Sequence, residues 1–373
     1  MRITWHSHSP VASTGYGTPS ALWLPALKAM GHDVTASAFT GQHMDFTWQG
    51  IKVVSTDDGQ FGATRLRALT KNADVLITLM DVWVYPPALI DSLKLPALNW
   101  FPVDTSPLSV LDERYFRHSK ATPVAMSEHG GRMLTEAGID GTAIPYAFDP
   151  AVFYPDDGDR QAARAGAGLD GLFAIGANAA NIDRKAWPEL LQAYARLWRE
   201  HPGQVILLAN TTLPGPGPAP AGALSLLAIT RRLGLPDAAV RWIPAGTMDQ
   251  PALASWYRSL DVLSACSFAE GFGLPIAEAE ACGTPVIVTA APPASTEIGL
   301  PGRHVACEPA WQQSHQAWWH RPSVTALHEA LEDAYAHRSD RAQASAAAAA
   351  HAKRYELGNV APLWAALLER TAR

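Results

Sequence analysis

The stretch that decides the fold runs from Ser267 to Thr289 and reads SFAEGFGLPIAEAEACGTPVIVT. It joins two short apolar runs, DVLSACS and GTPVIVT, which are typical of buried parallel strands. Pro275 stands where a helix begins and Gly283 where one ends, so we expect a short helix over residues 275–282. Strand, glycine loop, helix and strand in this order predict one parallel βαβ unit.

The loop and helix carry two chemical signals that at first conflict. Gly271, Phe272 and Gly273 precede the helix, where free amides and the positive end of the helix dipole suit a phosphate. Glu270 and Glu278 flank that position, and carboxylates oppose a bare phosphate but accept hydrogen bonds from sugar hydroxyls. A nucleotide sugar, with a diphosphate between two sugars, satisfies both signals.

Short apolar runs alternate with helix-length segments along the chain, which predicts an α/β fold with doubly wound parallel sheets. Pro, Asp and Gly residues from Pro155 to Gly171 predict a linker, after which the alternation starts again. Two Rossmann-like domains therefore follow, divided near residue 155. The segment Thr211–Ala223 is a low-complexity loop between a strand and a helix.

Composition narrows the function classes. The 373 residues carry a net charge of -6, and residues 1–150 hold 11 Lys and Arg against 14 Asp and Glu. No basic region is available to grip a nucleic-acid backbone. The three cysteines have no metal or redox spacing and indicate reduced core residues. Without an apolar leader or an 18-residue apolar run, the sequence predicts a cytoplasmic protein with no membrane span.

At this point the stretch EGFGLPIAEAEACGTPVI resembles the Glu-x7-Glu motif of retaining GT-B glycosyltransferases of the family 4 type, from Glu270 to Glu278. Weaker echoes are GHDV, VAMSEHGGRMLTEAGI and IPYAFDPAVFYP. The resemblance implies two Rossmann-like domains that face each other across a cleft. Residues 1–155 would form the acceptor side, with the last helix, 358–373, packed back on it, and residues 156–357 would bind the nucleotide sugar.

The resemblance also implies roles for the opening stretch. Glu270 would contact hydroxyls of the transferred sugar, and Glu278 those of the ribose. The backbone between them would face the sugar and the diphosphate: Gly271, Phe272, Gly273 and Leu274. An isolated acid is more commonly solvated or caps a helix, and that alternative stays open for both glutamates. Glu280 lies off this face and is expected at the surface.

A departing diphosphate needs fixed cations beside it. The segment GANAANIDRKAW supplies Arg184 and Lys185 where the resemblance implies an Arg and a Lys that bind the diphosphate. The family usually separates the two, so here one can act while the other faces solvent, and Lys185 matches better. The alternative is that Arg184 and Lys185 lie at the surface, at the start of a helix, as ordinary charged residues. Contacts to the base are expected near Ile243 and Pro244, often through main chain.

The first domain offers a second glycine loop, STGYGTPSALWL, between a strand and a helix. Gly15 and Gly17 resemble the family loop near the donor phosphate and the acceptor, although a tight turn alone explains them. Tyr16 is a candidate contact for the acceptor or the donor sugar. Asp104 stands near the position of a histidine that many family members use for the donor sugar, and a turn-capping aspartate is its alternative.

Several residues imitate functional groups and are set aside. His6 and His8 alternate on a strand but lack a third ligand at useful spacing, so packing or acceptor contact is favoured over metal binding. The Asp157-Gly158-Asp159 triplet looks like a metal-binding DxD motif, but it lies in the predicted linker, away from the nucleotide cleft. His129 opens a helix and is expected to be structural. The aromatic segment 311–322 is expected to pack, with peripheral membrane contact as the alternative.

The sequence therefore predicts a retaining glycosyltransferase that moves a hexose or related sugar from a nucleoside diphosphate sugar, such as a UDP- or GDP-sugar, to an acceptor hydroxyl. The mechanism would be front-face and need no metal or other cofactor. The acceptor would be a small molecule, a glycan or a glycolipid. The alternatives are a nucleotide-sugar epimerase or phosphorylase on the same scaffold, and a non-catalytic nucleotide-sugar-binding protein.

Overall fold

The computed structural model describes residues 1–41, 43–56, 60–213 and 223–372, which fold into two compact units. The units are composed as follows: unit 1 of Met1–Ala147, Trp311–Trp318 and Leu357–Arg373, and unit 2 of Phe148–Ala310 and Trp319–Glu356. The sequence placed residues 311–318 in the second domain, but they belong to unit 1, where Trp318 pairs with Ser106. Most of the predicted loop Thr211–Ala223 lies outside the described residues.

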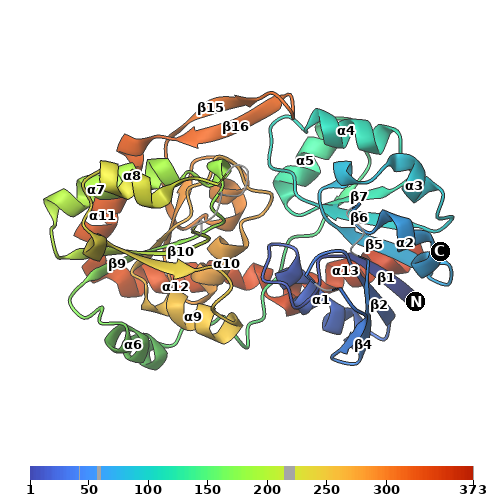
Figure 1. Cartoon of the computed structure of the whole chain (residues 1–373), viewed down its shortest axis with the longest axis horizontal. Helices are drawn as coiled ribbons and strands as arrows, with labels where there is room; N and C mark the ends of the chain where they lie inside the picture. Colours follow the sequence, from blue (N-terminus) through green and yellow to red (C-terminus); the bar gives the residue numbers. More distant parts are fainter. Residues whose placement is uncertain (42, 57–59, 214–222, 373) are drawn as a thin grey trace. The chain divides into compact units, whose positions relative to one another are not determined.

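Unit 1 is built on an eight-stranded sheet in the order β3-β4-β2-β1-β5-β6-β7-β8 (Figure 1). Its strands are β1 (Arg2–Ser7), β2 (Asp33–Ala38), β3 (Phe46–Trp48), β4 (Ile51–Ser55), β5 (Val75–Leu79), β6 (Ala97–Phe101), β7 (Thr122–Ala125) and β8 (Thr142–Ala143). β3 is antiparallel to β4, and the other neighbours are parallel. Every residue of β5 and β6 is buried, as in a sheet covered on both faces. The strand order reverses between β1 and β5.

The C-terminal helix belongs to unit 1. The helices of this unit are α1 (Gly17–Ala29), α2 (Ala63–Thr70), α3 (Pro87–Asp91), α4 (Val110–Arg117), α5 (Glu128–Glu136) and α13 (Leu357–Thr371). Trp364 of α13 packs edge-on against Trp23 of α1 and Trp100 of β6, with ring centroids 6.0 and 5.3 Å apart. These three buried indoles account for the docking of α13.

Unit 2 contains a six-stranded sheet in the order β11-β10-β9-β12-β13-β14, parallel throughout. Its strands are β9 (Phe173–Asn178), β10 (Val205–Thr211), β11 (Val240–Pro244), β12 (Val262–Ser264), β13 (Val286–Thr289) and β14 (Arg303–Val305). β12 and β13 are the two strands predicted on either side of the opening stretch. A hairpin of β15 (Cys307–Gln312) and β16 (Ala317–Pro322) follows.

Helices surround this sheet: α6 (Asp157–Gly166), α7 (Trp187–Glu200), α8 (Leu226–Arg232), α9 (Gln250–Ser259), α10 (Leu274–Ala281), α11 (Val324–Ala336) and α12 (Arg341–Ala352). α7 buries Trp187, Leu190, Leu191 and Tyr194 in the unit 2 core, the spacing of a helix with one apolar face. α10 occupies the position of the helix predicted over 275–282, shifted by one residue.

The predicted linker over residues 155–171 is wrong, because it contains the helix α6. Arg160 and Arg164 on this helix both bond the carboxylate of Asp261, at 2.6 and 3.1 Å. These ion pairs are partly buried, and they fix α6 to the segment that precedes β12. Pro, Asp and Gly at its ends mark where the helix begins and ends rather than a flexible connection.

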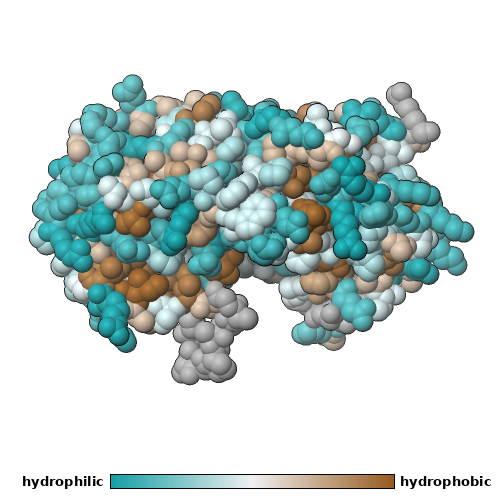
Figure 2. Space-filling model, turned by 90° about the horizontal axis from the view of Figure 1, so that it is seen from above, coloured by the Kyte–Doolittle hydropathy of each residue, from teal (hydrophilic) through white to brown (hydrophobic). Residues whose placement is uncertain are grey.

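In the described part of the chain, no helix combines the length and the apolar character needed to cross a bilayer. Hydrophobic residues form separate groups among hydrophilic ones on the face shown in Figure 2. Trp311 and Trp318 in the hairpin are 46% and 42% exposed, although their rings contact each other at 5.0 Å. The aromatic segment is therefore only partly packed.

Candidate functional site

The strand order of unit 2 reverses between β9 and β12, which are parallel neighbours. Open α/β sheets bind ligands beyond the carboxyl ends of their strands at such a point. The segment after β9 carries Arg184 and Lys185 in a short 3-10 turn, and the segment after β12 carries Glu270. The topology thus brings together side chains that lie 85 positions apart in the sequence.

These three charged side chains form one compact cluster. Lys185 Nζ donates to Glu270 Oε1 at 2.6 Å, and Ser267 Oγ donates to the same oxygen at 2.6 Å. Arg184 Nη1 lies 3.7 Å from Glu270 Oε2 and also donates to the carbonyl of Ala269. The side chains of Arg184, Lys185 and Glu270 are only 24%, 16% and 14% exposed. Both cations therefore approach Glu270, and neither points fully into solvent.

The cluster keeps Glu270 ionised. Burial alone opposes the charge, but Lys185 and Arg184, together with hydrogen bonds from Lys185 and Ser267, outweigh it and hold the pKa of Glu270 below its ordinary value. A charged carboxylate is an acceptor only, so it is available for hydroxyl donors. Arg184 and Lys185 beside it are cations that can pair with an anionic group.

The loop between Glu270 and α10 is shaped by its glycines. Gly273 has φ of +100°, a conformation that side chains rarely adopt, and it directly precedes α10. A Cβ at Gly273 would lie 2.8 Å from Ile276 Cδ1. Phe272 is buried against Tyr355, with ring centroids 5.1 Å apart, so only its backbone can face a ligand. Leu274 is the first residue of α10, and its amide is among those at the helix N-terminus.

Glu278 lies in a different environment from Glu270, although the motif joins them. It is 4% exposed and accepts a hydrogen bond from Tyr257 Oη at 3.0 Å. Asn178, the last residue of β9, donates to the same Tyr257 oxygen at 2.6 Å and accepts from Asn210 at 3.0 Å. Burial raises the pKa of Glu278 to about 8. This carboxyl is therefore largely protonated at neutral pH.

The expectation that Glu280 lies at the surface is wrong. Its side chain is fully buried, and His351 Nδ1 lies 2.9 Å from its Oε2. Burial raises the pKa of Glu280 to about 7, against the lowering effect of His351. The physical reason is that α10 packs against both α9 and α12, so positions beyond the ligand-facing side are also covered.

Ile243 and Pro244 end β11, the outermost strand on one side of the unit 2 sheet. Ile243 is half-buried and Pro244 is exposed. The carbonyl of Pro244 accepts hydrogen bonds from the amide and hydroxyl of Thr247, at 3.3 and 2.7 Å. Contact between this turn and a nucleotide base stays a prediction.

Unit 1 has its own switch point, between β1 and β5. Tyr16, in the segment after β1, donates to Asp81 Oδ2 at 2.8 Å, and Asp81 follows β5. Gly15 is exposed, and a Cβ there would meet no atom within 4 Å. Gly17 is different, because a Cβ would lie 2.1 Å from the carbonyl oxygen of Ala12. A tight turn therefore explains Gly17, whereas no close contact requires a glycine at Gly15, whose carbonyl accepts a hydrogen bond from the hydroxyl of Tyr146 at 3.3 Å.

Asp104 is half-buried in the segment that follows β6. Burial, with nearby Asp81 and Asp104, raises the pKa of the carboxyl of Asp112 well above its ordinary value. His129 Nε2 lies 3.2 Å from the carbonyl oxygen of Thr105 and is buried, in keeping with a structural role. Sequence reasoning missed Asp81 and Asp112, although Asp81 follows a buried strand and could have been found by that signal.

The residues considered for metal binding have other partners. His6 is fully buried between Ser37 Oγ at 2.8 Å and the carbonyl oxygen of Phe61 at 2.9 Å. His8 lies beyond the end of β1 and pairs with a threonine hydroxyl. Asp159 of the Asp-Gly-Asp triplet pairs with Arg258 at 2.9 Å. Among the described residues, a group with metal-ligand spacing occurs away from this site, on α7 and α11.

Comparison with known proteins places this geometry in context. The family profile described as "Glycosyl transferases group 1" matches residues 171–316, which include Arg184, Lys185, Glu270 and Glu278. The D-inositol 3-phosphate glycosyltransferase of Segniliparus rotundus is 39% identical over 145 residues, 39% of this chain and 30% of that protein. The D-inositol 3-phosphate glycosyltransferase 2 of Catenulispora acidiphila is 37% identical over 132 residues. The chain thus spans about 30% of the length of these curated relatives.

Solved structures resemble the chain over nearly its whole length. Sucrose-phosphate synthase from Thermosynechococcus elongatus has a TM-score of 0.80 at 17% identity and covers 99% of this chain and 98% of its own. Anabaena Alr3699/HepE in complex with UDP and glucose has a TM-score of 0.74 at 17% identity, with 99% of both chains covered. The likeness shows the fold, and it confirms the predicted α/β class with two Rossmann-like domains of the GT-B type.

Proposed function

We propose that this chain is a retaining glycosyltransferase that uses a nucleoside diphosphate sugar. The observation that carries the proposal is the cluster of Lys185, Arg184 and Glu270 at the switch point between β9 and β12. It offers two cations and one ionised carboxylate in a half-buried setting. The match of residues 171–316 to the glycosyltransferase profile supports the same function.

The proposed chemistry follows from the groups in the cluster. When the donor binds, its diphosphate takes the place of Glu270 as the partner of Lys185 and Arg184, which then stabilise the charge that develops on the leaving group. Glu270, released from Lys185, accepts hydrogen bonds from hydroxyls of the transferred sugar and positions it. The acceptor hydroxyl attacks on the face from which the diphosphate departs, and a phosphate oxygen takes its proton.

The second glutamate would contact the ribose of the donor. Tyr257 donates a hydrogen bond to Glu278 and accepts one from Asn178 at the end of β9. Ribose hydroxyls would donate to Glu278 as its carboxyl loses its proton, so donor binding would release a proton. UDP-sugars are the first donors to test, because the Anabaena protein was solved with UDP-glucose.

Unit 1 suggests the class of acceptor. The segments that follow the carboxyl ends of its strands contain no Lys or Arg in the sequence, and Asp81 and Asp104 lie in two of them. Arg65 of α2 reaches this edge at the end of β4, where it donates to the carbonyl of Ser55. We therefore propose an unphosphorylated acceptor whose hydroxyls donate to these carboxylates, unlike the inositol phosphate in the names of the curated relatives.

The test measures nucleotide release and sugar transfer from UDP-, GDP- and ADP-glucose with the full chain. Wild type is expected to release nucleotide from one donor class, and Arg184→Ala, Lys185→Ala to lose on the order of 10²-fold or more of that rate. Arg231→Ala, Arg232→Ala is the matched control, since it removes two adjacent, exposed cations from the same unit. Binding without release would favour a non-catalytic binding protein.

Acceptor choice is tested with the donor identified in that way. Free inositol and inositol phosphate are compared as acceptors, alongside neutral sugars. We expect inositol phosphate to be a poorer acceptor than inositol, because its negative charge would meet the carboxylates of Asp81 and Asp104. A higher kcat/KM for inositol phosphate than for inositol would overturn the proposed acceptor class while leaving the donor chemistry intact.

A further inference from the structure

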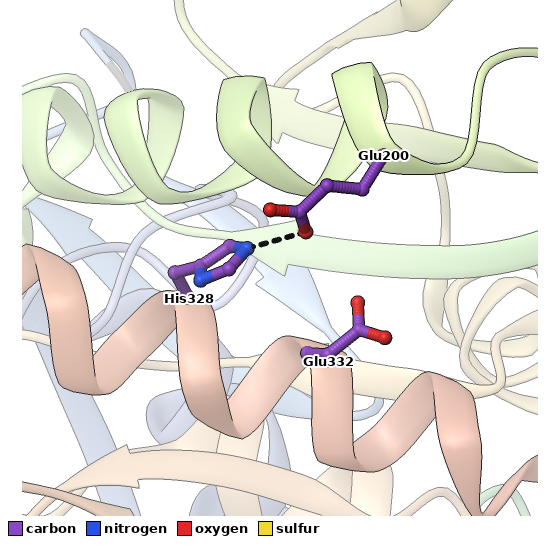
Figure 3. Close-up of side chains that lie close together, drawn as sticks. All are labelled: Glu200, His328 and Glu332. Atoms are coloured by element: carbon purple, nitrogen blue, oxygen red, sulfur yellow. Dashed lines mark hydrogen bonds and ion pairs between the residues drawn. The ribbon is translucent and has the colours of Figure 1, made fainter.

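A second cluster of ionisable side chains lies in unit 2, where the end of α7 meets α11. Glu200 is the last residue of α7, and His201 follows it. His328 and Glu332 lie on α11, one turn apart. Figure 3 shows that His328 points to Glu200, with the carboxylate of Glu332 beside it. The proposed glycosyl transfer uses none of these residues.

The distances within this cluster suit a metal ion. His328 Nε2 lies 2.7 Å from Glu200 Oε2, and one ligand atom each from Glu200, His328 and Glu332 lie within 4.8 Å of one another. His201 Nε2 lies 2.8 Å from Glu332 Oε2 and 3.1 Å from Oε1. Tetrahedral Zn²⁺ with bonds of about 2.0–2.2 Å sets its ligand atoms about 3.3 Å apart. One atom each of Glu200, His328 and Glu332 therefore lies within reach of a single ion, and His201 contacts Glu332.

The electrostatics of the cluster also favour a cation. Two carboxylates meet the C-terminal end of α7, where the helix dipole is negative. Within the described part of the chain, neither glutamate pairs with Lys or Arg, and both contact imidazoles instead. The two arginines of the last turns of α7 are engaged elsewhere: Arg196 with Thr325 Oγ1 and Arg199 with the carbonyl of Leu233.

Burial and packing hold the imidazoles in place. The side chains of His328 and His201 are 17% and 21% exposed. The ring of His201 lies against Tyr335, with centroids 4.1 Å apart, and Tyr335 Oη donates to Gln204 at 2.7 Å. Side chains that are already oriented lose less entropy when a metal binds. The glutamates, at 50% and 39% exposure, leave a path for the ion from solvent.

We propose that Glu200, His328 and Glu332 bind one Zn²⁺ ion, which joins α7 to α11, and that His201 positions Glu332. One imidazole nitrogen and two carboxylate oxygens, with water as the fourth ligand, suit Zn²⁺, whereas Mg²⁺ and Ca²⁺ prefer oxygen alone. The ion would cross-link two helices of unit 2 and stabilise that unit. Its role is structural, at a distance in sequence from the segment that carries Glu270.

The test uses the full chain, freed of any affinity tag and of metal by chelation and desalting. Zinc chloride is titrated calorimetrically, with magnesium chloride as the comparison. We expect one Zn²⁺ per chain with micromolar affinity, a rise in Tm with Zn²⁺, and no response to Mg²⁺. Absorption of the Co²⁺ form should show tetrahedral coordination.

Substitutions of the proposed ligands test where the ion binds. His328→Ala and Glu332→Gln should each weaken Zn²⁺ binding by about 10-fold or more and abolish the Tm rise. His337→Ala is the matched control, because His337 also pairs with a carboxylate of α11, Asp333, which Arg303 neutralises. It should bind as wild type does. Absent Zn²⁺ binding in wild type, or undiminished binding in both folded variants, would overturn the proposal.

Discussion

The two units share the order of the parallel strands around the switch point and differ in the side chains that lie there. In unit 2 the segments after β9 and β12 bring together Arg184, Lys185 and Glu270. In unit 1 the equivalent segments, after β1 and β5, bring together Tyr16 and Asp81. The same strand order therefore presents different groups, and we propose that those of unit 2 bind an anion with hydroxyls and those of unit 1 bind hydroxyls alone.

The largest expected effect follows from removal of the cations that distinguish unit 2. Arg184→Ala, Lys185→Ala should lower turnover by on the order of 10²-fold or more. It should also destabilise the fold by about 3 kcal/mol, because a largely buried Glu270 carboxylate is left without its two cationic partners and keeps only the hydrogen bond from Ser267. Steady-state transfer and urea unfolding measure the two effects.

A third substitution separates these effects. Arg184→Ala, Lys185→Ala, Glu270→Gln removes the stranded charge and should recover most of the lost stability without recovering turnover. Normal transfer by the double variant would break the contrast between the two switch points.

The raised pKa of Glu278 predicts that the free energy of unfolding changes with pH by up to a few kcal/mol. Its pKa rises from 4.5 to about 8 on folding, so its protonated form is the one that the fold favours. Its contribution is full in acid and is lost as pH rises from about 4.5 to about 8, by at most about 1.4 kcal/mol per pH unit. Glu278→Gln should flatten this decline.

The measurement is the free energy of unfolding of wild type and Glu278→Gln at several pH values across that range. Glu280→Gln is the comparison on the same helix, because burial also raises the pKa of Glu280, to about 7, so this substitution should remove a separate part of the decline. Parallel pH profiles for wild type and Glu278→Gln would show that Glu278 does not set this decline.

Local sequence signals were sufficient for α10 and the two strands that flank it, but not for the contact at the unit 2 switch point. Pro275 and Gly283 mark the ends of α10 to within a residue, and the apolar runs on either side form β12 and β13. Lys185 and Glu270 could be proposed together only through the family resemblance. Their contact depends on the pairing of β9 with β12, which no local pattern specifies.

Other features were not predictable because they depend on burial by distant segments. Glu280 is covered by α12, some 70 residues later, and its partner His351 gives no sign in the sequence. The helix α6 was mistaken for a linker because Asp and Gly serve equally at helix ends and in loops. The pairing of Arg160 and Arg164 with Asp261 requires the folded unit.

A smaller effect, on the KM for the acceptor, is expected from a substitution in unit 1. Asp81→Asn keeps the shape of the side chain and an acceptor for Tyr16, but it removes the charge that hydroxyl donors would meet. We expect the KM for the acceptor to rise about tenfold, with little change in donor hydrolysis, as for loss of one charged hydrogen bond. Kinetics with donor and acceptor varied separately measure both. A loss confined to donor hydrolysis would place Asp81 with the donor instead.

The smallest effect on stability distinguishes the two glycines of the unit 1 loop. Gly15→Ala should change the free energy of unfolding by less than about 0.5 kcal/mol, because a Cβ there meets no atom within 4 Å. Gly17→Ala, the control, places a Cβ 2.1 Å from the carbonyl oxygen of Ala12 and should be clearly destabilising. A Gly15→Ala chain that keeps its stability but transfers sugar poorly would assign the exposed glycine to a ligand, since no packing loss accounts for the defect. Equal activity and equal stability would leave Gly15 as one residue of a turn, and Tyr16 with Asp81 as the groups that make the unit 1 switch point differ from that of unit 2.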